Sequence, residues 1–337
     1  MNPPPIPKRK RNIGLWITIC ILGVLLFFSI IMNLASSVGS AFQPGEFGRS
    51  GGIDEFPSLV ERWSYGQGRT KAARIPLQGM IFRQEAVGLF GPRVDKIHDL
   101  ISQIRMATHD SAIRAIILEV DSPGGAITPS DEIYRELRRF KESGENRIVI
   151  AFTRDMMASG GYYAAMSADW IIAEPTAVVG SIGVIMQSIN FQRLTDDLGI
   201  RDVTIKSGSN KDLLNPFREV NVEQVALLQT VIDSMYTRFV GIVQASRSIP
   251  EDALAELADG RIFTADQAIE VDLIDQVGYW DDLVRQTAKM LKVEEVKFVR
   301  YHRETDFFTM LTQGRVGLNP AAVLKWQLPQ IMFLWKP

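Results

Sequence analysis

Ser159 is the side chain whose position first suggests chemistry. It lies in the segment Met157–Tyr163, shortly after the apolar run Arg147–Phe152. The apolar run predicts a strand, and the residues after Ser159 predict the start of a helix. A hydroxyl at such a turn, followed by glycine amides, has the arrangement that acyl transfer requires of a nucleophile. A serine before two glycines is also common in ordinary turns, so Ser159 alone leaves both interpretations open.

The sequence offers no clear histidine to activate this serine. The chain has only three, His98, His109 and His302, and none stands in a recognisable triad context. Lysine is the alternative base, but only its neutral amine accepts a proton, and an ordinary lysine has a pKa of about 10.4. Burial can lower the pKa of a lysine by roughly 3 to 5. A serine enzyme of this kind therefore needs a lysine in an apolar setting.

A second glycine turn, Asp121–Gly125, follows the apolar strand candidate Ile113–Val120. Pro123 would fix the direction of the chain, and Gly124 and Gly125 would let backbone amides face a developing oxyanion. A phosphate loop or a plain strand-to-helix turn are the alternatives for this motif alone. The sequence contains neither a Walker pattern nor a full dinucleotide fingerprint, which disfavours a nucleotide cofactor.

Two further motifs gain meaning only in combination. The turn Val179–Gly183, which contains Ser181, would alone indicate close packing of backbone, and Lys211 would alone be a solvated loop lysine. Taken in order with the other two turns, they resemble the signal peptide peptidase A family, membrane-anchored Ser/Lys proteases related to Clp-type peptidases and crotonases. The resemblance covers roughly residues 72–285 and includes the later segments Asp259–Thr264 and Leu273–Gly278.

The resemblance implies a role for each matching residue. Ser159 matches the nucleophile, Lys211 the general base, and Ser181 the serine that orients the lysine. The family's oxyanion hole falls on the amides of Gly125 and Gly160, with Gly124 as a further candidate.

Lys206 is the rival for the role of the base. It lies at the end of a short predicted strand, Val203–Ile205, and this position favours an exposed or structural charge over a catalytic one. We therefore favour Lys211, for which Ile205, Leu213 and Leu214 could supply the apolar surroundings.

The resemblance also implies an assembly. Longer members of the family hold two repeats of the fold, with the serine in one and the lysine in the other, whereas this chain holds one copy with both. We therefore expect a homo-oligomeric ring in which Lys211 of one subunit reaches Ser159 of a neighbour. The implied substrates are remnant signal peptides and other membrane-proximal or unfolded polypeptides.

The composition of the chain argues against nucleic acid, metal and cofactor as binding partners. The 337 residues carry a formal net charge of −2, which provides no general attraction for nucleic acid. Cys20 is the only cysteine, so an intrachain disulfide and a cysteine-based metal site are both excluded. We expect no metal and no cofactor.

The N-terminal segment predicts export. Lys8–Arg11 precede Ile13–Leu34, 22 uncharged residues that would span roughly 30 Å as a helix. The next basic residue is Arg49, so the positive-inside rule places the N-terminus in the cytosol and the rest of the chain outside the inner membrane. A cleaved signal peptide is the alternative, because the segment 35–41 is rich in small residues.

Strand and helix patterns alternate after this anchor, which predicts an α/β fold with a mostly parallel sheet and right-handed crossovers. The strand candidates not yet named are Ala73–Phe82 and Trp170–Ala173, and the main helix candidates are Arg93–Ala107, Val222–Arg247, Ala265–Glu270 and Trp280–Leu291. The predicted organisation is a basic tail 1–12, an anchor 13–34, a linker 35–71, a peptidase domain 72–300 and a C-terminal tail 301–337. The apolar part of that tail, Trp326–Trp335, is too short to span a membrane, and we expect it to dock on a neighbour or on the lipid surface.

Three other functions compete with the protease. A crotonase-like acyl-CoA enzyme would share the fold and the oxyanion site, but an exported domain would not meet CoA. A non-enzymatic membrane scaffold would not need all the matched residues. A stomatin-associated Ser/Lys membrane protease is a close relative, disfavoured because the sequence shows no further transmembrane segment.

Overall fold

The computed structural model describes residues 21–29, 59–83, 85–86, 94–303 and 331–334. The chain divides into two compact units, Met1–Gly51 and Gly52–Pro337. In the first unit residues 21–29 are helical, and the rest of the predicted anchor 13–34 lies outside the described residues. No helix within the described part has the length and apolar character needed to cross a bilayer.

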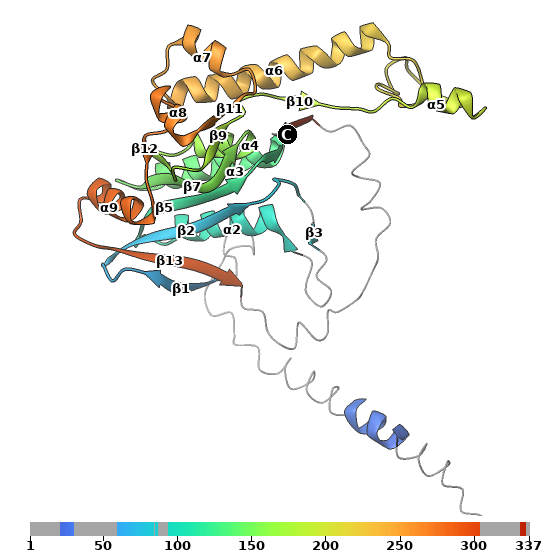
Figure 1. Cartoon of the computed structure of the whole chain (residues 1–337). Coiled ribbons are helices and arrows are strands. Elements are labelled where there is room, and N and C mark those ends of the chain that lie inside the picture. The colour runs from blue at the N-terminus through green and yellow to red at the C-terminus, as the bar shows by residue number, and fades with distance from the viewer. Residues whose placement is uncertain (1–20, 30–58, 84, 87–93, 304–330, 335–337) are drawn as a thin grey trace, which may run out of the picture. The chain divides into compact units, whose positions relative to one another are not determined.

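A mostly parallel sheet forms the centre of the second unit (Figure 1). Its main path runs β1-β13-β2-β5-β7-β8-β12, and every neighbouring pair is parallel except β1 with β13. The strands of this path are β1 Leu59–Tyr65, β2 Thr70–Gln78, β5 Ile113–Ser122, β7 Ile148–Ala158, β8 Trp170–Ala173, β12 Gln276–Val277 and β13 Val296–Arg303. The predicted mixed α/β class with a mostly parallel sheet is therefore confirmed.

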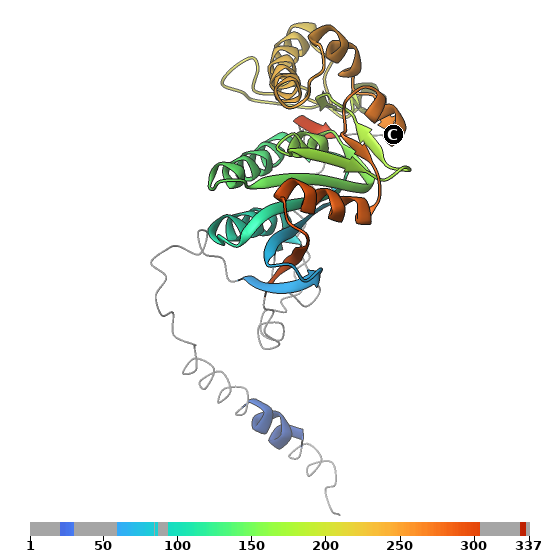
Figure 2. The ribbon, with the colours of Figure 1, turned by 90° about the vertical axis from the view of Figure 1, so that its left-hand side faces the viewer.

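Helices cover both faces of this sheet, which explains the continuous apolar character of its central strands. Helices α2 (Lys96–His109), α3 (Ile127–Glu142) and α4 (Gly160–Ala165) pack on one face, and α9 (Trp280–Leu291) packs on the other (Figure 2). Along β5, Ile116 and Leu118 belong to the hydrophobic core between the sheet and helices α2, α3 and α4. Ala115 and Ile117 belong to the core between the sheet and α9.

The parallel arrangement brings the turns after β5 and β7 together at the carboxyl ends of the strands. In register, Ser122 of β5 pairs with Met157 of β7, so the turn after β5 and the turn after β7 are neighbours. The short strand β6 (Gly124–Ala126) follows the first turn, and α4 follows the second. Ligand sites of open parallel sheets commonly form at the carboxyl ends of the strands, and both turns lie there.

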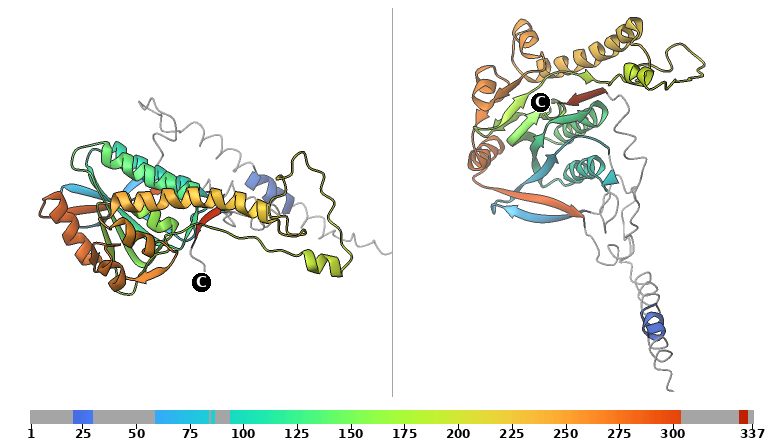
Figure 3. Two further views of the ribbon diagram at one scale, coloured as in Figure 1. Left: turned by 90° about the horizontal axis from the view of Figure 1, so that it is seen from above. Right: turned by 45° about the vertical axis from the view of Figure 1, so that its right-hand side comes forward.

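The remaining elements form a second layer beyond the carboxyl ends of the central strands. Strand β9 (Val178–Gly180) continues the sheet beside the end of β7, and β11 (Ile262–Thr264) pairs antiparallel with β9. A long helix, α6 (Val222–Ser246), crosses above them and is followed by α7 (Glu251–Leu257) and α8 (Ala265–Glu270) (Figure 3). A small hairpin of β3 (Glu85–Ala86) and β4 (Val94–Asp95) precedes α2.

Residues 187–221, here called the arm, project beyond the body of the sheet (Figures 1 and 3). The arm follows the short strand β10 (Ile185–Met186), contains helix α5 (Gln192–Asp197), and leads into α6. The predicted strand Val203–Ile205 is wrong, because residues 201–206 are irregular backbone. Its apolar side chains have no sheet to join: Val203 is 84% exposed and Ile205 is 97% exposed.

Two other boundaries differ from the predictions. Strand β7 continues to Ala158 and does not end at Phe152, because it pairs with β8 first and then with β9. Within the segment predicted as a linker, residues 59–65 form β1 and Thr70 begins β2, and both strands belong to the sheet.

A cluster of charges stabilises the sheet on the α9 side. Glu119 of β5 is only 6% exposed and forms an ion pair with Arg74. It also lies 3.0 Å from Arg300 and 3.6 Å from Arg154. Burial by itself raises the pKa of Glu119, but the hydrogen bond from Arg74 and the positive charges around it outweigh burial and hold that pKa below its ordinary value.

Replacing Glu119 by alanine should lower the free energy of unfolding at pH 7 by about 3–5 kcal/mol, because three arginines lose their shared carboxylate. The folded-state pKa is depressed, so this contribution is fully present above the unfolded pKa of about 4.3 and is lost as the pH falls through the folded pKa. In urea unfolding, the difference from wild type should therefore be smaller at pH 3 than at pH 7. Glu174→Ala, which removes one contact of 3.7 Å with Arg154, should cost under about 1 kcal/mol. A pH-independent loss for Glu119→Ala would contradict the electrostatic cause.

Candidate active site

Ser159 occupies a strained turn between β7 and α4. It has φ 51° and ψ −115°, a left-handed backbone that a residue other than glycine rarely adopts. Its amide donates to the Gly180 carbonyl at 2.7 Å, and its carbonyl accepts from the Tyr163 amide at 2.8 Å. These two bonds hold the turn from both sides. A strained turn of this type presents a nucleophile at the end of a strand.

The hydroxyl of Ser159 is buried. The residue is 1% exposed, and its Oγ has no hydrogen-bond partner among the described residues. The hydroxyl therefore has no histidine as a partner: His98 lies on α2, His109 ends the same helix, and His302 lies on β13. A buried polar atom without a partner is costly, and such exceptions concentrate at functional sites.

Gly125 and Gly160 lie on the two turns that meet beside Ser159. Gly160 is the first residue of α4, where amides have no acceptor within the helix. Gly125 lies in β6, which is a neighbour of α4. A Cβ at Gly125 would lie 2.4 Å from the Ile81 carbonyl oxygen, so this position also needs glycine for close backbone packing.

The third candidate donor, Gly124, is already engaged. Its amide donates to Ser122 Oγ at 3.1 Å, and the Ser122 hydroxyl donates to the Gly79 carbonyl at 2.7 Å. Gly124 has φ 96°, so its main contribution here is the shape of the turn.

Ser181 is brought beside Ser159 by the pairing of β9 with β7. Ala158 pairs in register with Gly180, so Ser159 and Ser181 follow two aligned residues. Ser181 has φ 53°, is 5% exposed, and donates its amide to the Arg261 carbonyl at 2.7 Å. The two serines predicted from distant motifs thus lie at adjacent strand ends.

Lys211 does not join this cluster within the single chain. It lies exposed on the arm, where its amide donates to the Gly208 carbonyl at 3.2 Å. Its expected apolar surroundings are incomplete, since Leu213 and Leu214 are half-buried and Ile205 is exposed. The structure therefore assembles Ser159, Ser181 and the glycine turns, and it leaves the lysine apart.

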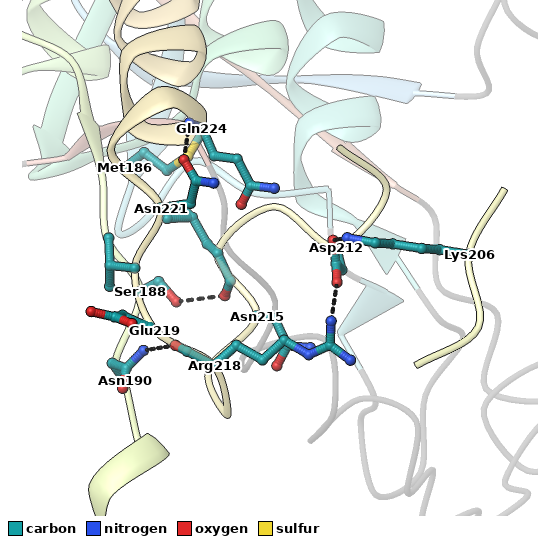
Figure 4. A pocket seen from close by; sticks show the side chains of 12 residues that line it. Met186, Ser188, Asn190, Lys206, Asp212, Asn215, Arg218, Glu219, Asn221 and Gln224 are labelled. Carbon is teal, nitrogen blue, oxygen red and sulfur yellow. Dashed lines mark hydrogen bonds and ion pairs between the residues drawn. The ribbon is translucent and has the colours of Figure 1, made fainter. Parts of the chain in front are cut away.

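Lys206 is committed to another partner. Its ammonium donates to Asp212 Oδ1 at 2.5 Å and to the Ser209 carbonyl at 2.8 Å, and the bond from Lys206 lowers the pKa of Asp212 (Figure 4). This ion pair holds the Lys206 side chain on the arm. Lys206 and Asp212 line a polar cavity of about 390 Å³ at the arm, which Ser159 does not reach.

A strand from the C-terminal tail completes the surroundings of the site. Strand β14 (Ile331–Leu334) pairs antiparallel with β6 on one side and with β10 on the other, and it is a neighbour of α4. Phe333 is in register with Gly125. The expectation that this tail docks on a neighbour or on lipid is wrong for residues 331–334, which pair with strands of their own chain. The short apolar segment just after Pro329 was the available signal for a strand.

A buried serine without a hydroxyl partner among the described residues, at a strained strand-to-helix turn and beside the first amides of α4, defines a serine-type hydrolase site. The comparisons with known proteins agree. A model of peptidase family S49 matches residues 141–294, a range that includes Ser159, Ser181 and Lys211.

Several relatives share most of the chain. A protein of Enterococcus faecium, named for signal peptide peptidase A, is 33% identical over 262 residues, which are 78% of this chain and 74% of the relative. A protein of Methanocaldococcus jannaschii named for a protease is 30% identical over 239 residues, 70% of this chain and 76% of the relative. A protein of Synechocystis, also named for a protease, is 41% identical over 177 residues, 52% of this chain and 62% of the relative. The chain therefore belongs to the signal peptide peptidase A family and is a serine protease.

Proposed function

We propose that the protein is a serine endopeptidase in which Ser159 is the nucleophile and Lys211 of a neighbouring copy is the general base. The observation that carries this proposal is the buried Ser159 hydroxyl, which has no partner among the described residues of its own chain. Ser181, one residue beyond the strand end that pairs with Ala158, would orient the incoming lysine.

The exposed apolar surface of the arm supports a neighbouring copy as the source of the lysine. Many exposed apolar side chains on one projecting segment indicate an interaction site, and burial against a neighbour would also remove water from Lys211. The exposed apolar residues of the arm are Ile189, Phe191, Leu194, Leu198, Ile200, Val203, Ile205, Phe217 and Val220. We infer a homo-oligomeric ring, because a patch that contacts a different patch on the next copy forms a ring when the rotation between copies closes.

Formation of the acyl-enzyme in the proposed reaction uses two proton transfers, and its hydrolysis uses two more, from water to Lys211 and from Lys211 back to Ser159. The neutral amine of Lys211 takes the proton of Ser159 as the Oγ attacks the peptide carbonyl, and the amides of Gly125 and Gly160 stabilise the oxyanion. The ammonium then gives this proton to the leaving amine, and the acyl-enzyme remains on Ser159. Water, deprotonated by the same lysine, hydrolyses the ester and frees the serine.

The pairing of β14 suggests how a substrate binds. Strands β6 and β10 both offer main-chain groups to an extended segment, and a polypeptide substrate would add to them as a strand in place of β14. Main-chain recognition of this type suits extended substrates of varied sequence. We therefore propose remnant signal peptides and other membrane-proximal or unfolded polypeptides as substrates, in keeping with the name of the Enterococcus faecium relative.

The location is part of the proposal. Residues 13–34 would anchor the chain in the lipid of the inner membrane, with residues 1–12 in the cytosol and the catalytic domain outside it.

Mixing two inactive proteins tests the shared site. Equal amounts of Ser159→Ala and Lys211→Ala, dissociated and reassembled together, should recover about a quarter of the wild-type hydrolysis of an unfolded protein. One neighbour contact in four then pairs an intact serine with an intact lysine. Each variant alone, and each mixed with the double variant, should remain inactive. Absence of recovery in assemblies shown by affinity tags to contain both variants would overturn the proposal.

A further inference from the structure

Helix α6 connects the arm to the body of the protein. Its C-terminal half packs into the core through Phe239 and Val243, which are fully buried. Its N-terminal half is exposed: Val222 is 81% exposed, Leu227 48% and Val231 39%. The helix is therefore held at one end, and its other end carries the arm.

The arm is bonded to the free end of α6. Asn221 caps the helix by accepting from the amides of Glu223 and Gln224. The Gln224 side chain donates to the Ser209 carbonyl at 3.2 Å, two residues before Lys211. Any change in the direction of α6 therefore moves the loop that carries Lys211.

Three side chains meet where α6 leaves the body. Arg238 of α6 donates to Asp131 of α3 at 2.6 Å and to the hydroxyl of Tyr163, on α4, at 3.2 Å. The Tyr163 hydroxyl donates to Asp131 at 2.5 Å. These three residues, here called the α6 cluster, join the arm's helix to the helix that begins directly after Ser159.

Packing around Tyr163 makes this junction rigid. Its ring lies 5.0 Å from the ring of Phe239 on α6 and 5.7 Å from that of Tyr134 on α3. Burial raises the pKa of Tyr163, and its bond to Asp131 acts in the same direction, so the phenol keeps the proton that it donates. The α6 cluster thus combines hydrogen bonds with aromatic contacts among three helices.

The length of α6 between the cluster and the arm makes the position of Lys211 sensitive to the direction of the helix. From Arg238 to Val222 the helix runs 238 − 222 = 16 residues, about 24 Å. A tilt of about 5° at the cluster would move the far end by about 2 Å. A displacement of about 1 Å in a reacting group can reduce a rate by about a hundredfold.

We infer that Asp131, Tyr163 and Arg238 are positioning residues, which set the direction of α6 and so deliver Lys211 to Ser159 of the neighbouring copy. The inference rests on the proposed function, in which the two residues come from different copies. The α6 cluster does not touch substrate and acts through the arm.

The mixing experiment tests the inference when Arg238→Ala is added either to the Ser159→Ala protein or to the Lys211→Ala protein, but not to both. Active sites of the mixture take the lysine from the Ser159→Ala copy and the serine from the Lys211→Ala copy. Arg238→Ala in the lysine-donating copy should reduce the recovered activity at least about tenfold. The same change in the serine-donating copy should reduce it less than about threefold.

A control on the same helix is Gln229→Ala, which removes a bond of 2.7 Å to Asp233 within α6 itself. It should leave the recovered activity unchanged in either copy. Equal losses from Arg238→Ala in both copies, or no loss in the lysine-donating copy, would overturn the inference. Failure of the unmodified mixture to recover activity would instead overturn the shared site.

A charge exchange keeps the test informative if Arg238→Ala does not assemble. Asp131→Arg combined with Arg238→Asp preserves an ion pair and a bond to Tyr163 in the reverse order. The combined variant in the lysine-donating copy should recover at least half of the unmodified activity, and each single change should not. An assembled combined variant as inactive as the singles would overturn the role of the cluster.

Discussion

Replacing Ser159 by alanine should reduce hydrolysis of an unfolded protein by at least about 10³-fold, because the attack on the carbonyl has no other nucleophile. Lys211→Arg should cause a loss of similar size. Arginine keeps the positive charge and much of the length, but it cannot become a neutral base. Initial rates of the assembled full-length protein, with assembly checked by light scattering, provide the measurement.

Lys206→Arg is the matched control. Arginine in this position can still pair with Asp212 and donate to the Ser209 carbonyl, so the arm should keep its shape. We expect its activity to stay within about threefold of wild type. A large loss in Lys206→Arg together with normal activity in Lys211→Arg would exchange the roles of the two lysines, and normal activity in both would exclude a lysine base.

Removing residues 331–337 should raise the activity on polypeptide substrates at least about tenfold at substrate concentrations below KM. Strand β14 occupies both strand edges that a substrate would use, and as a tethered segment it competes at an effective concentration in the millimolar range. The gain should appear as a lower apparent KM, with kcat nearly unchanged.

Point changes separate strand pairing from the mere length of the tail. Phe333→Pro removes one main-chain donor at the position in register with Gly125, and it should reproduce part of the gain. Phe333→Ala keeps that donor and should have a smaller effect, whereas deleting only residues 335–337 should change little. An unchanged or higher KM in the truncated protein would show that β14 is not a competitor.

The sequence predicted the centre of this protein better than its margins. Ile113–Val120 and Trp170–Ala173 are apolar runs of strand length, and they became β5 and β8 with at most two residues of difference. The end of β7 could not be read in the same way, because Arg154 and Asp155 interrupt the apolar pattern and only pairing with β9 continues the strand. Val203–Ile205 shows the opposite error, since a β-branched composition does not make a strand without a partner.

The site was predicted in pieces. The turns of Ser159, Gly125 and Ser181 are local motifs, and parallel strands bring their ends to one edge, where the structure has them. The sequence did not predict that the Gly124 amide donates a hydrogen bond to Ser122, because this bond depends on the geometry of the Ser122 side chain. The pairing of β14 with β6 joins residues about 200 positions apart, and no local pattern specifies such a contact.

Strand β14 also has a consequence for the behaviour of the protein in solution. An uncovered strand edge is a template for pairing with other chains, and natural proteins cover or charge such edges. By filling the space between β6 and β10, β14 blocks both edges against unintended partners while no substrate is bound. A protease that recognises extended chains through its own strand edges is, for the same reason, prone to aggregate through them. A protein without residues 331–337 should then be less soluble as well as more active.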